Sequence, residues 1–229
     1  MIKKLLLLGY PVSHSISPVF QQAALNWYGM DVTYQTKETS PENLGNMVSL
    51  LRNENYLGAN LTIPHKERVI EYLDKIDPWA TKMGAVNTII KDGNILAGHN
   101  TDGHAFLKSL KDKAGFDPSG ESVLILGAGG SARSAAFSLA QENVKSLLIA
   151  NRTPERGQSL VSALKDSINE VAAIPINDVI FEEAVTTSGL IVNATPIGMN
   201  HSGFENLSPI KTGLIHRDTL IYDMVYTPT

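Results

Sequence analysis

An unbroken apolar segment that runs directly into a glycine-rich one constrains this chain more than any other feature. Residues 122–126 read Ser-Val-Leu-Ile-Leu, and residues 127–132 read Gly-Ala-Gly-Gly-Ser-Ala. A short apolar run is typical of a parallel strand that is buried on both faces. The alanine-rich residues that follow, up to Ala140, predict a helix. A strand, a tight turn and a helix in this order predict a doubly wound α/β unit.

The glycine-rich residues fit the G-x-G-x-x-A pattern of dinucleotide-binding loops. Gly127 permits the tight turn, Gly129 lets the backbone approach a pyrophosphate, and Ala132 allows close packing of helix on strand. The helix N-terminus adds N–H groups and a partial positive charge. A purely structural turn is the alternative, but the strand–loop–helix context favours a nucleotide. We therefore expect cofactor contacts from Gly127, Ala128, Gly129, Gly130 and Ser131.

The end of the next predicted strand, residues 146–150, indicates which dinucleotide binds. An NAD-binding chain would place Asp or Glu here, to bind the ribose 2′-hydroxyl. This strand is instead followed by two arginines and no carboxylate at its end. Guanidinium groups form bidentate bonds with a phosphate, whereas solvated cations are unfavourable near a helix N-terminus. NADP is therefore the predicted cofactor, with contacts from Asn151, Arg152, Thr153 and Arg156.

Strand and helix patterns alternate along the whole chain, which predicts a mostly parallel α/β architecture. Residues 86–90 and 94–97 flank Lys-Asp-Gly and predict a β-hairpin. A turn-rich break at residues 116–120 follows a predicted helix. We expect two domains: a substrate domain with the hairpin at residues 1–101, a linking helix and turn at 102–118, and a Rossmann-like NADP-binding domain at 119–229.

Composition argues against several classes of protein. The chain has no cysteine, which excludes disulfides and thiolate metal sites, and its six histidines lack metal-ligand spacing, so no metal is expected. A net charge of −4 gives no basic footprint for nucleic acid. No apolar stretch approaches the roughly 20 residues that span a bilayer. We expect a soluble, cytoplasmic protein whose partner is a small molecule.

Residues 60–66, Asn-Leu-Thr-Ile-Pro-His-Lys, place polar side chains at the end of another predicted strand. Asn60 and Thr62 alternate with apolar residues, Pro64 stops the strand, and a helical pattern runs from Lys66 to Leu73. Ligands bind beyond the carboxyl ends of strands in open α/β sheets. A strand-to-helix loop with a solvated lysine is the alternative. These residues are candidates for a substrate site.

Three further polar clusters lie at predicted element ends, at residues 14–17, 87–88 and 100–103. Each has a structural alternative: Ser17 as a helix N-cap, Asn87 as a turn residue, and Asp102 as an acid that complements a helix dipole. Taken together, their hydroxyls, amides and carboxylate and the Lys66 ammonium suit a polyhydroxylated, anionic small molecule.

In this order along the chain, the motifs resemble those of the shikimate dehydrogenase family. The resemblance implies reversible, NADPH-dependent reduction of 3-dehydroshikimate to shikimate in aromatic amino-acid (chorismate) biosynthesis, by a monomer or homodimer. The matching segments are residues 9–18, 60–66, 84–88, 100–103, 127–130, 151–153, 193–199 and 222–226.

The resemblance also implies roles for individual residues. Lys66 and Asp102 look like the catalytic pair, in which Lys66 donates or accepts a proton and Asp102 assists it. Thr195 and Met224 match cofactor-binding positions, Met224 on the nicotinamide side. The positions that match substrate-binding residues are Ser15, Ser17, Asn60, Thr62, Asn87 and, from the second domain, Tyr226.

The sequence departs from the family pattern in three places. Family members carry a further C-terminal segment beyond Thr229, with a glycine near the nicotinamide, a substrate-binding glutamine and helices that return to the first domain. Gln21 stands where some members have histidine, and Pro78 stands where many have an acid that touches the cofactor.

Three alternative functions stay open at this point. A quinate dehydrogenase of the same family is disfavoured by Ser17 and Arg152. Methylenetetrahydrofolate dehydrogenase shares the two-domain layout but lacks the H-S-x-S-P and N-T-D-G motifs. A catalytically impaired family member would act only in binding; the presence of Lys66 and Asp102 argues against this role, and the missing C-terminal segment leaves it open.

Overall fold

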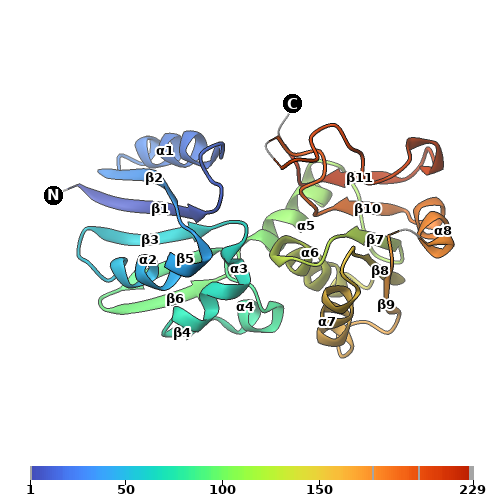
Figure 1. The fold of residues 1–229 in the computed structure, drawn as a ribbon, viewed down its shortest axis with the longest axis horizontal. Helices are drawn as coiled ribbons and strands as arrows, with labels where there is room; N and C mark the ends of the chain where they lie inside the picture. The colour runs from blue at the N-terminus through green and yellow to red at the C-terminus, as the bar shows by residue number, and fades with distance from the viewer. Residues whose placement is uncertain (1, 177, 201, 227–229) are drawn as a thin grey trace. The chain divides into compact units, whose positions relative to one another are not determined.

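The computed structural model describes residues 2–176, 178–200 and 202–226, which form two compact units, Met1–Thr101 and Asp102–Thr229 (Figure 1). Each unit is an α/β structure built around its own sheet, so the predicted fold class is confirmed. Helix α5 (Asp102–Asp112), which the sequence places between the domains, packs against α6 (Gly130–Ala140) within the second unit. No helix among the described residues has the length and apolar character needed to cross a bilayer.

The first unit contains a six-stranded mixed sheet in the order β2-β1-β3-β5-β6-β4. Strand β1 pairs in parallel with β2 and β3, whereas β5 is antiparallel to both β3 and β6. The predicted hairpin is therefore confirmed as β5 and β6, and it supplies the antiparallel part of the sheet. The strands are β1 (Lys3–Gly9), β2 (Val32–Glu38), β3 (Tyr56–Leu61), β4 (Lys75–Ile76), β5 (Thr88–Asp92) and β6 (Ile95–His99).

Helices lie on both faces of this sheet (Figure 1). Most of them are short, because turns and 3₁₀ segments interrupt the chain between strands. They are α1 (Ser17–Trp27), η1 (Pro41–Asn43), α2 (Leu44–Leu50), α3 (His65–Arg68), η2 (Val69–Tyr72) and α4 (Pro78–Met83).

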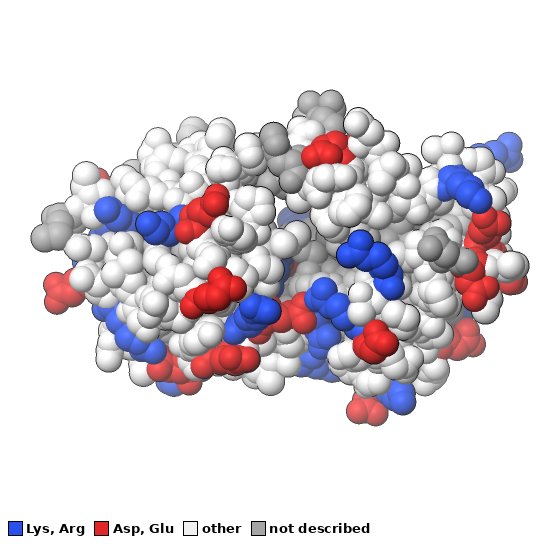
Figure 2. Space-filling view, in the orientation of Figure 1, with Lys and Arg blue, Asp and Glu red and all other residues white. Residues whose placement is uncertain are grey.

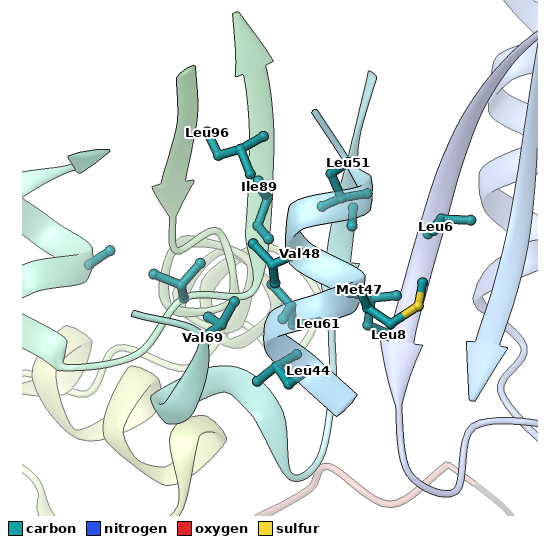
Figure 3. Close-up of a cluster of buried hydrophobic side chains, with 13 residues drawn as sticks. Leu6, Leu8, Leu44, Met47, Val48, Leu51, Leu61, Val69, Ile89 and Leu96 are labelled. Atoms are coloured by element: carbon teal, nitrogen blue, oxygen red, sulfur yellow. The ribbon is translucent and has the colours of Figure 1, made fainter. Parts of the chain in front are cut away.

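The larger core of the first unit lies between α2 and the sheet. Figure 3 shows the α2 side chains directed at leucine and isoleucine side chains of the strands. Leu8, Leu44 and Leu96 are fully buried in this cluster. Because β1, β3, β5 and β6 all contribute, this cluster holds together the strands that carry residues 60–66 and Asn87.

A smaller core lies under α1, where Leu25 packs with Leu7 and Tyr34. The outward side of α1 is apolar: Val19 is 74% exposed and Trp27 is 86% exposed. The helix carries no charged residue, and Figure 2 shows an uncharged surface where Figure 1 places it.

The second unit contains a five-stranded, fully parallel sheet in the order β11-β10-β7-β8-β9. Strand β7 is central and its residues are almost entirely buried, as the apolar run predicts. The elements after α5 are β7 (Ser122–Leu126), α6, β8 (Ser146–Ala150), α7 (Pro154–Leu164), β9 (Val171–Ile174), α8 (Val179–Thr187), β10 (Leu190–Asn193), η3 (Thr212–Leu214) and β11 (Leu220–Asp223).

The prediction of one continuous helix from Lys66 to Leu73 is wrong. The structure has one α-helical turn, α3, followed by the 3₁₀ helix η2. The Lys66 carbonyl oxygen accepts a hydrogen bond from the Val86 N–H group at 2.7 Å, which diverts it from the regular helical ladder. The helical segment after Ser40 is likewise divided, into η1 and α2.

Strand β4 and helices α4 and α8 were not expected from the sequence. Helix α4 begins as N-cap rules describe, because the Asp77 carboxylate accepts hydrogen bonds from the N–H groups of Trp79 and Ala80 at 2.8 and 3.1 Å. Pro78 is its first residue, so the Asp-Pro pair was a usable helix-start signal. Asp178 caps α8 in the same way through the Ile180 N–H group.

Replacing Leu8 by alanine should destabilise the first unit by about 2–5 kcal/mol, because it leaves a cavity in a fully buried cluster. Both tryptophans, Trp27 and Trp79, lie in the first unit, so urea unfolding followed by tryptophan fluorescence reports on that unit. Val19→Ala is the matched control, since this side chain is 74% exposed. An equal effect of the two substitutions would contradict this description of the core.

Candidate active site

Most of the predicted site residues divide into two groups, one in each unit. We call the first the substrate cluster; it consists of Ser15, Ser17, Asn60, Thr62, Lys66 and Asn87. We call the second the cofactor cluster; it consists of Gly127, Ala128, Gly129, Gly130, Ser131, Asn151, Arg152, Thr153, Arg156, Thr195 and Met224. Their members lie in strands, in the segments next to strands, or in the first turns of helices, and Asp102 is the first residue of α5.

A hydrogen-bond network joins the two asparagines of the substrate cluster. The Asn60 Nδ2 group donates to the Asn87 carbonyl oxygen at 3.3 Å and to the Thr88 hydroxyl at 3.1 Å. The Thr88 hydroxyl in turn donates to Asn87 Oδ1 at 2.9 Å. The network arises because β3 and β5 are neighbours, with Asn60 opposite Thr88. The structure therefore brings Asn60 and Asn87 together.

Tyr34 fixes the other side of the Asn60 amide. Its hydroxyl donates to Asn60 Oδ1 at 2.9 Å, and the residue is 6% exposed. Burial raises the pKa of the Tyr34 hydroxyl to about 12, so it stays a donor at neutral pH. Sequence reasoning missed this residue, since it lies 26 positions from Asn60 and looks like an ordinary apolar position of β2.

Thr62 and Lys66 are held by backbone contacts around the end of β3. The Thr62 N–H group donates to the Leu8 carbonyl oxygen at 2.9 Å, and the Thr62 carbonyl accepts from the His65 N–H group at 2.9 Å. A Cβ atom on Gly9 would collide with the Thr62 methyl group, so glycine is required there. The Lys66–Val86 backbone bond brings the start of α3 next to the segment that carries Asn87.

His65 anchors α3 from the buried side. Its Nε2 donates to the Thr39 carbonyl oxygen at 2.7 Å, which fixes the tautomer because that oxygen can only accept. Burial lowers the pKa of the imidazole, and the nearby Arg68 charge lowers it further, while the bond to Thr39 opposes the shift. His65 therefore stays neutral beside the candidate catalytic lysine.

The two serines lie together at the start of α1. The Ser15 hydroxyl donates to the Ser17 hydroxyl at 3.1 Å and accepts from the Ser17 N–H group at 3.2 Å. Helix α1 begins at Ser17 with Pro18 in its first turn, and the residue at its N-cap position is Ile16, not Ser17. The alternative role of Ser17 as an N-cap is therefore wrong.

Asp102 begins α5 directly after Thr101, which is fixed by Asn87. Asn87 Nδ2 donates to the Thr101 hydroxyl at 2.9 Å, and the Thr101 N–H group donates to Asn87 Oδ1 at 3.0 Å. Asn87 thus orders the backbone immediately before Asp102. Sequence reasoning did not identify Thr101, although it stands inside the N-T-D-G motif.

The glycine-rich loop of the cofactor cluster has the geometry that the fingerprint predicts. Gly127 has φ +104°, in the left-handed region, and a Cβ there would lie 3.0 Å from the Ala194 carbonyl oxygen. Helix α6 starts at Gly130 without a side-chain cap, and first-turn N–H groups have no partner within a helix. A glycine turn that leads directly into a helix N-terminus suits an anionic group such as a pyrophosphate.

Arg156 lies beside this loop. A Cβ built on Gly129 would be 4.0 Å from the Arg156 Nη2 atom. Asn151 orders the intervening turn, because its Nδ2 donates to the Thr153 carbonyl oxygen at 2.7 Å. A guanidinium next to a pyrophosphate loop suits a nucleotide with an additional phosphate. These residues fit NADP.

Thr195 and Met224 follow the adjacent strands β10 and β11. The Met224 N–H group donates to the Asn193 carbonyl oxygen at 3.0 Å, and the Thr195 hydroxyl donates to Asn193 Oδ1 at 2.7 Å. Tyr226 is 51% exposed. Sequence reasoning did not assign a role to Asn193, which stands in the matched segment at residues 193–199.

Comparison with known proteins places both units in one family. A family model described as the shikimate dehydrogenase substrate-binding domain matches residues 7–89, and one described as shikimate/quinate 5-dehydrogenase matches residues 109–201. The chain is 42% identical over 224 residues to the shikimate dehydrogenase (NADP(+)) of Geobacter metallireducens, covering 97% of this chain and 77% of that protein. The chain belongs to the shikimate dehydrogenase family.

Solved structures of family members share the fold. A crystal structure of shikimate dehydrogenase in complex with NADP+ is 33% identical, has a TM-score of 0.87, and is matched over 99% of this chain and 77% of its own. The Thermus thermophilus shikimate 5-dehydrogenase in complex with NADP(H) and shikimate is also 33% identical, with a TM-score of 0.84 and coverage of 99% and 80%. The family resemblance predicted from the sequence is confirmed.

Replacing Tyr34 by phenylalanine should change the pH dependence of stability of this shikimate dehydrogenase family member. The raised pKa, about 12 against an ordinary 10.0, contributes stability that is fully present below pH 10 and is lost as pH rises through 12. Near pH 11 the wild type should lose about 1 kcal/mol relative to pH 8 from this group, and the variant should not.

Urea unfolding followed by tryptophan fluorescence at pH 8 and pH 11 measures this difference. At pH 8 the wild type should have the larger free energy of unfolding, because Asn60 Oδ1 loses its hydrogen-bond donor in the variant. The difference in free energy of unfolding between the two proteins should be smaller at pH 11. Tyr28→Phe is the control, since Tyr28 is 78% exposed. The same difference in free energy of unfolding at both pH values would refute the role of the Tyr34 hydroxyl.

Proposed function

We propose that this chain is an NADP-dependent shikimate dehydrogenase that interconverts 3-dehydroshikimate and shikimate. The observation that carries the proposal is the ordered amide network of Asn60 and Asn87, which ends one residue before Asp102. This network fixes hydrogen-bonding groups for a polyhydroxylated substrate near the ends of β3 and β6. Lys66 follows β3 in the chain, and Asp102 follows β6. The Geobacter relative supports the same activity by its name.

Lys66 supplies the proton that ketone reduction needs. Bound NADPH supplies a hydride to the ketone carbon, and negative charge then develops on the ketone oxygen. A proton donor within hydrogen-bond reach of that oxygen stabilises the transition state. Lys66 donates this proton in reduction and accepts it in oxidation, and Asp102 holds the ammonium and orients a substrate hydroxyl.

The remaining residues of the substrate cluster bind the substrate. Ser15 and Ser17 donate to its carboxylate, which needs no full counter-charge when hydroxyl donors converge on it. Asn60, Thr62 and Asn87 bind its ring hydroxyls, and Tyr226 is a further substrate-binding residue. Buried networks that are already hydrogen-bonded hold such groups in place without reorganisation.

The cofactor cluster binds the two ends of NADP. The glycine loop binds the pyrophosphate, and Asn151, Arg152, Thr153 and Arg156 bind the 2′-phosphate. Thr195 and Met224 contact the cofactor on the other side of the loop. A cytoplasmic location and a monomeric or homodimeric state stay predictions, and sedimentation velocity would decide between monomer and dimer.

Reduction of NADP+ at 340 nm tests the function. Shikimate and quinate should be compared, each with NADP+ and NAD+, on the 229-residue chain and on the same chain fused to the C-terminal segment of the Geobacter relative. Turnover of shikimate with NADP+ is the expected result. Turnover of quinate with NAD+ alone would identify a quinate dehydrogenase instead, and binding without turnover in both proteins would identify an impaired family member.

Lys66→Ala should lower kcat by about 10²–10⁴-fold, the usual contribution of a general acid. KM for shikimate should change little, because the lysine acts mainly in the transition state. Lys82→Ala on α4 is the matched control, since this lysine is exposed and outside both clusters. Near-normal kcat in Lys66→Ala would disprove the assignment.

Arg152→Ala and Arg156→Ala should each raise KM for NADPH by roughly 10–100-fold, since a hydrogen bond to a charged group is worth about 1.5–3 kcal/mol. KM for NADH should stay the same, because NADH lacks the 2′-phosphate. Arg217→Ala is the control, as that side chain is 88% exposed and pairs with Asp218. An equal rise in KM for NADPH and for NADH would mean that these arginines do not bind the 2′-phosphate.

A further inference from the structure

Asn193, the last residue of β10, has an unusually complete set of hydrogen bonds. Its side chain is buried, with 3% of the residue exposed. Oδ1 accepts from the Thr195 N–H group at 3.1 Å and from the Thr195 hydroxyl at 2.7 Å. Nδ2 donates to the Ile197 carbonyl oxygen at 3.3 Å and to Asp223 Oδ1 at 3.0 Å. These partners fix the amide orientation, since the Thr195 N–H group can only donate and the Asp223 carboxylate can only accept.

The same residue also fixes the segment that follows β11. Its backbone carbonyl accepts from the Met224 N–H group at 3.0 Å. Asp223 Oδ1, the acceptor for Asn193, also accepts from the Val225 N–H group at 2.9 Å. Asn193 therefore sets the backbone on both sides of Met224, as well as the turn that carries Thr195.

This turn also touches the glycine loop. A Cβ on Gly127 would lie 3.0 Å from the Ala194 carbonyl oxygen and 3.4 Å from the Thr195 Cγ2 atom. The Ala194 N–H group donates to the Leu126 carbonyl oxygen at 2.9 Å. The Asn193 side chain itself bonds to Thr195, Ile197 and Asp223, so a change in its amide acts first on the turn at Thr195 and on the segment around Met224, whereas the pyrophosphate loop is contacted by the neighbouring Ala194 and Thr195.

The strand order separates the two ends of a bound dinucleotide. In the order β11-β10-β7-β8-β9, the glycine loop follows the central β7. Arg152 and Arg156 follow β8 on one side, whereas Thr195 and Met224 follow β10 and β11 on the other. A dinucleotide that lies across these strand ends, with its pyrophosphate at β7, has its 2′-phosphate half towards β8 and its reactive half towards β10.

We propose that Asn193 is a positioning residue for the nicotinamide half of the cofactor, acting through Thr195 and Met224. The inference rests on the proposed function, because it assumes NADP in this site. An amide is needed since one planar group must accept from Thr195 and donate to Asp223. A carboxylate at position 193 keeps the size but loses both donated bonds and places a second negative charge beside Asp223.

Asn193→Asp should weaken the binding of a ligand that has the nicotinamide half and leave nearly unchanged the binding of one that lacks it. Affinity for NADPH, measured by the fluorescence of its dihydronicotinamide ring, should fall about 5-fold or more, the effect of roughly 1 kcal/mol of lost bonding. Affinity for 2′,5′-ADP, which has the 2′-phosphate but no nicotinamide, should change less than about 2-fold by calorimetry because its contacts are untouched.

Turnover provides the second readout. A misplaced nicotinamide should lower the kcat of the variant by roughly 10–100-fold relative to wild type. The primary isotope effect, measured by comparing NADPH with NADPH deuterated at C4, should increase because hydride transfer becomes more rate-limiting. A merely structural role predicts a lower 2′,5′-ADP stoichiometry and an unchanged isotope effect, and this pattern would overturn the proposal. Equal affinity losses for NADPH and 2′,5′-ADP would also overturn it.

Asp223→Ala is a second variant that should fold, because Asp223 is exposed. It removes one acceptor of the Asn193 amide and should change the same quantities in the same direction by a smaller factor. Asp218→Ala, in the segment before β11 and outside the cofactor cluster, should change neither. If the wild type turns over neither shikimate nor quinate, the proposed function fails, and the NADPH and 2′,5′-ADP affinities still decide the role of Asn193.

Discussion

Strand pairing is the constraint on which both candidate sites depend, because the register of each pair decides which residues meet at the ends of the strands. In the second unit the last residues of all five strands are register partners: Asp223 pairs with Asn193, Asn193 with Leu126, Leu126 with Ala150, and Ala150 with Ile174. The residues that follow these ends therefore form one row beside the glycine loop. In the first unit the antiparallel β5 places Asn87, which precedes it, next to the end of β3.

Buried hydrogen bonds at these strand ends orient the site before any ligand binds. The amides of Asn60, Asn87 and Asn193 each accept and donate within the protein. A buried polar group that loses its partner costs about 1–3 kcal/mol, so alternative orientations of these amides are unfavourable. Such preorganisation is what electrostatic catalysis requires, since no energy is then spent on reorienting groups during the reaction.

Local signals in the sequence predicted much of this arrangement. The glycine loop, the two arginines and the polar residues of segment 60–66 were identified because each is encoded by consecutive residues. Tyr34 and Asn193 were missed because their roles depend on partners 26 and 30 positions away, on different strands. The early end of α3 was missed for the same reason, as the Lys66 carbonyl bonds to Val86 from a later segment.

The proposed shikimate dehydrogenase activity requires that the chain transfer a hydride from NADPH to 3-dehydroshikimate. The most direct test is to incubate the chain with 3-dehydroshikimate and NADPH deuterated at C4. The mass of the product is then measured by mass spectrometry. We expect shikimate that carries one deuterium from the cofactor, formed in step with the loss of absorbance at 340 nm. NADPH oxidation without deuterium in the product, or no shikimate formation by either the 229-residue chain or its C-terminally extended form, would contradict the claim.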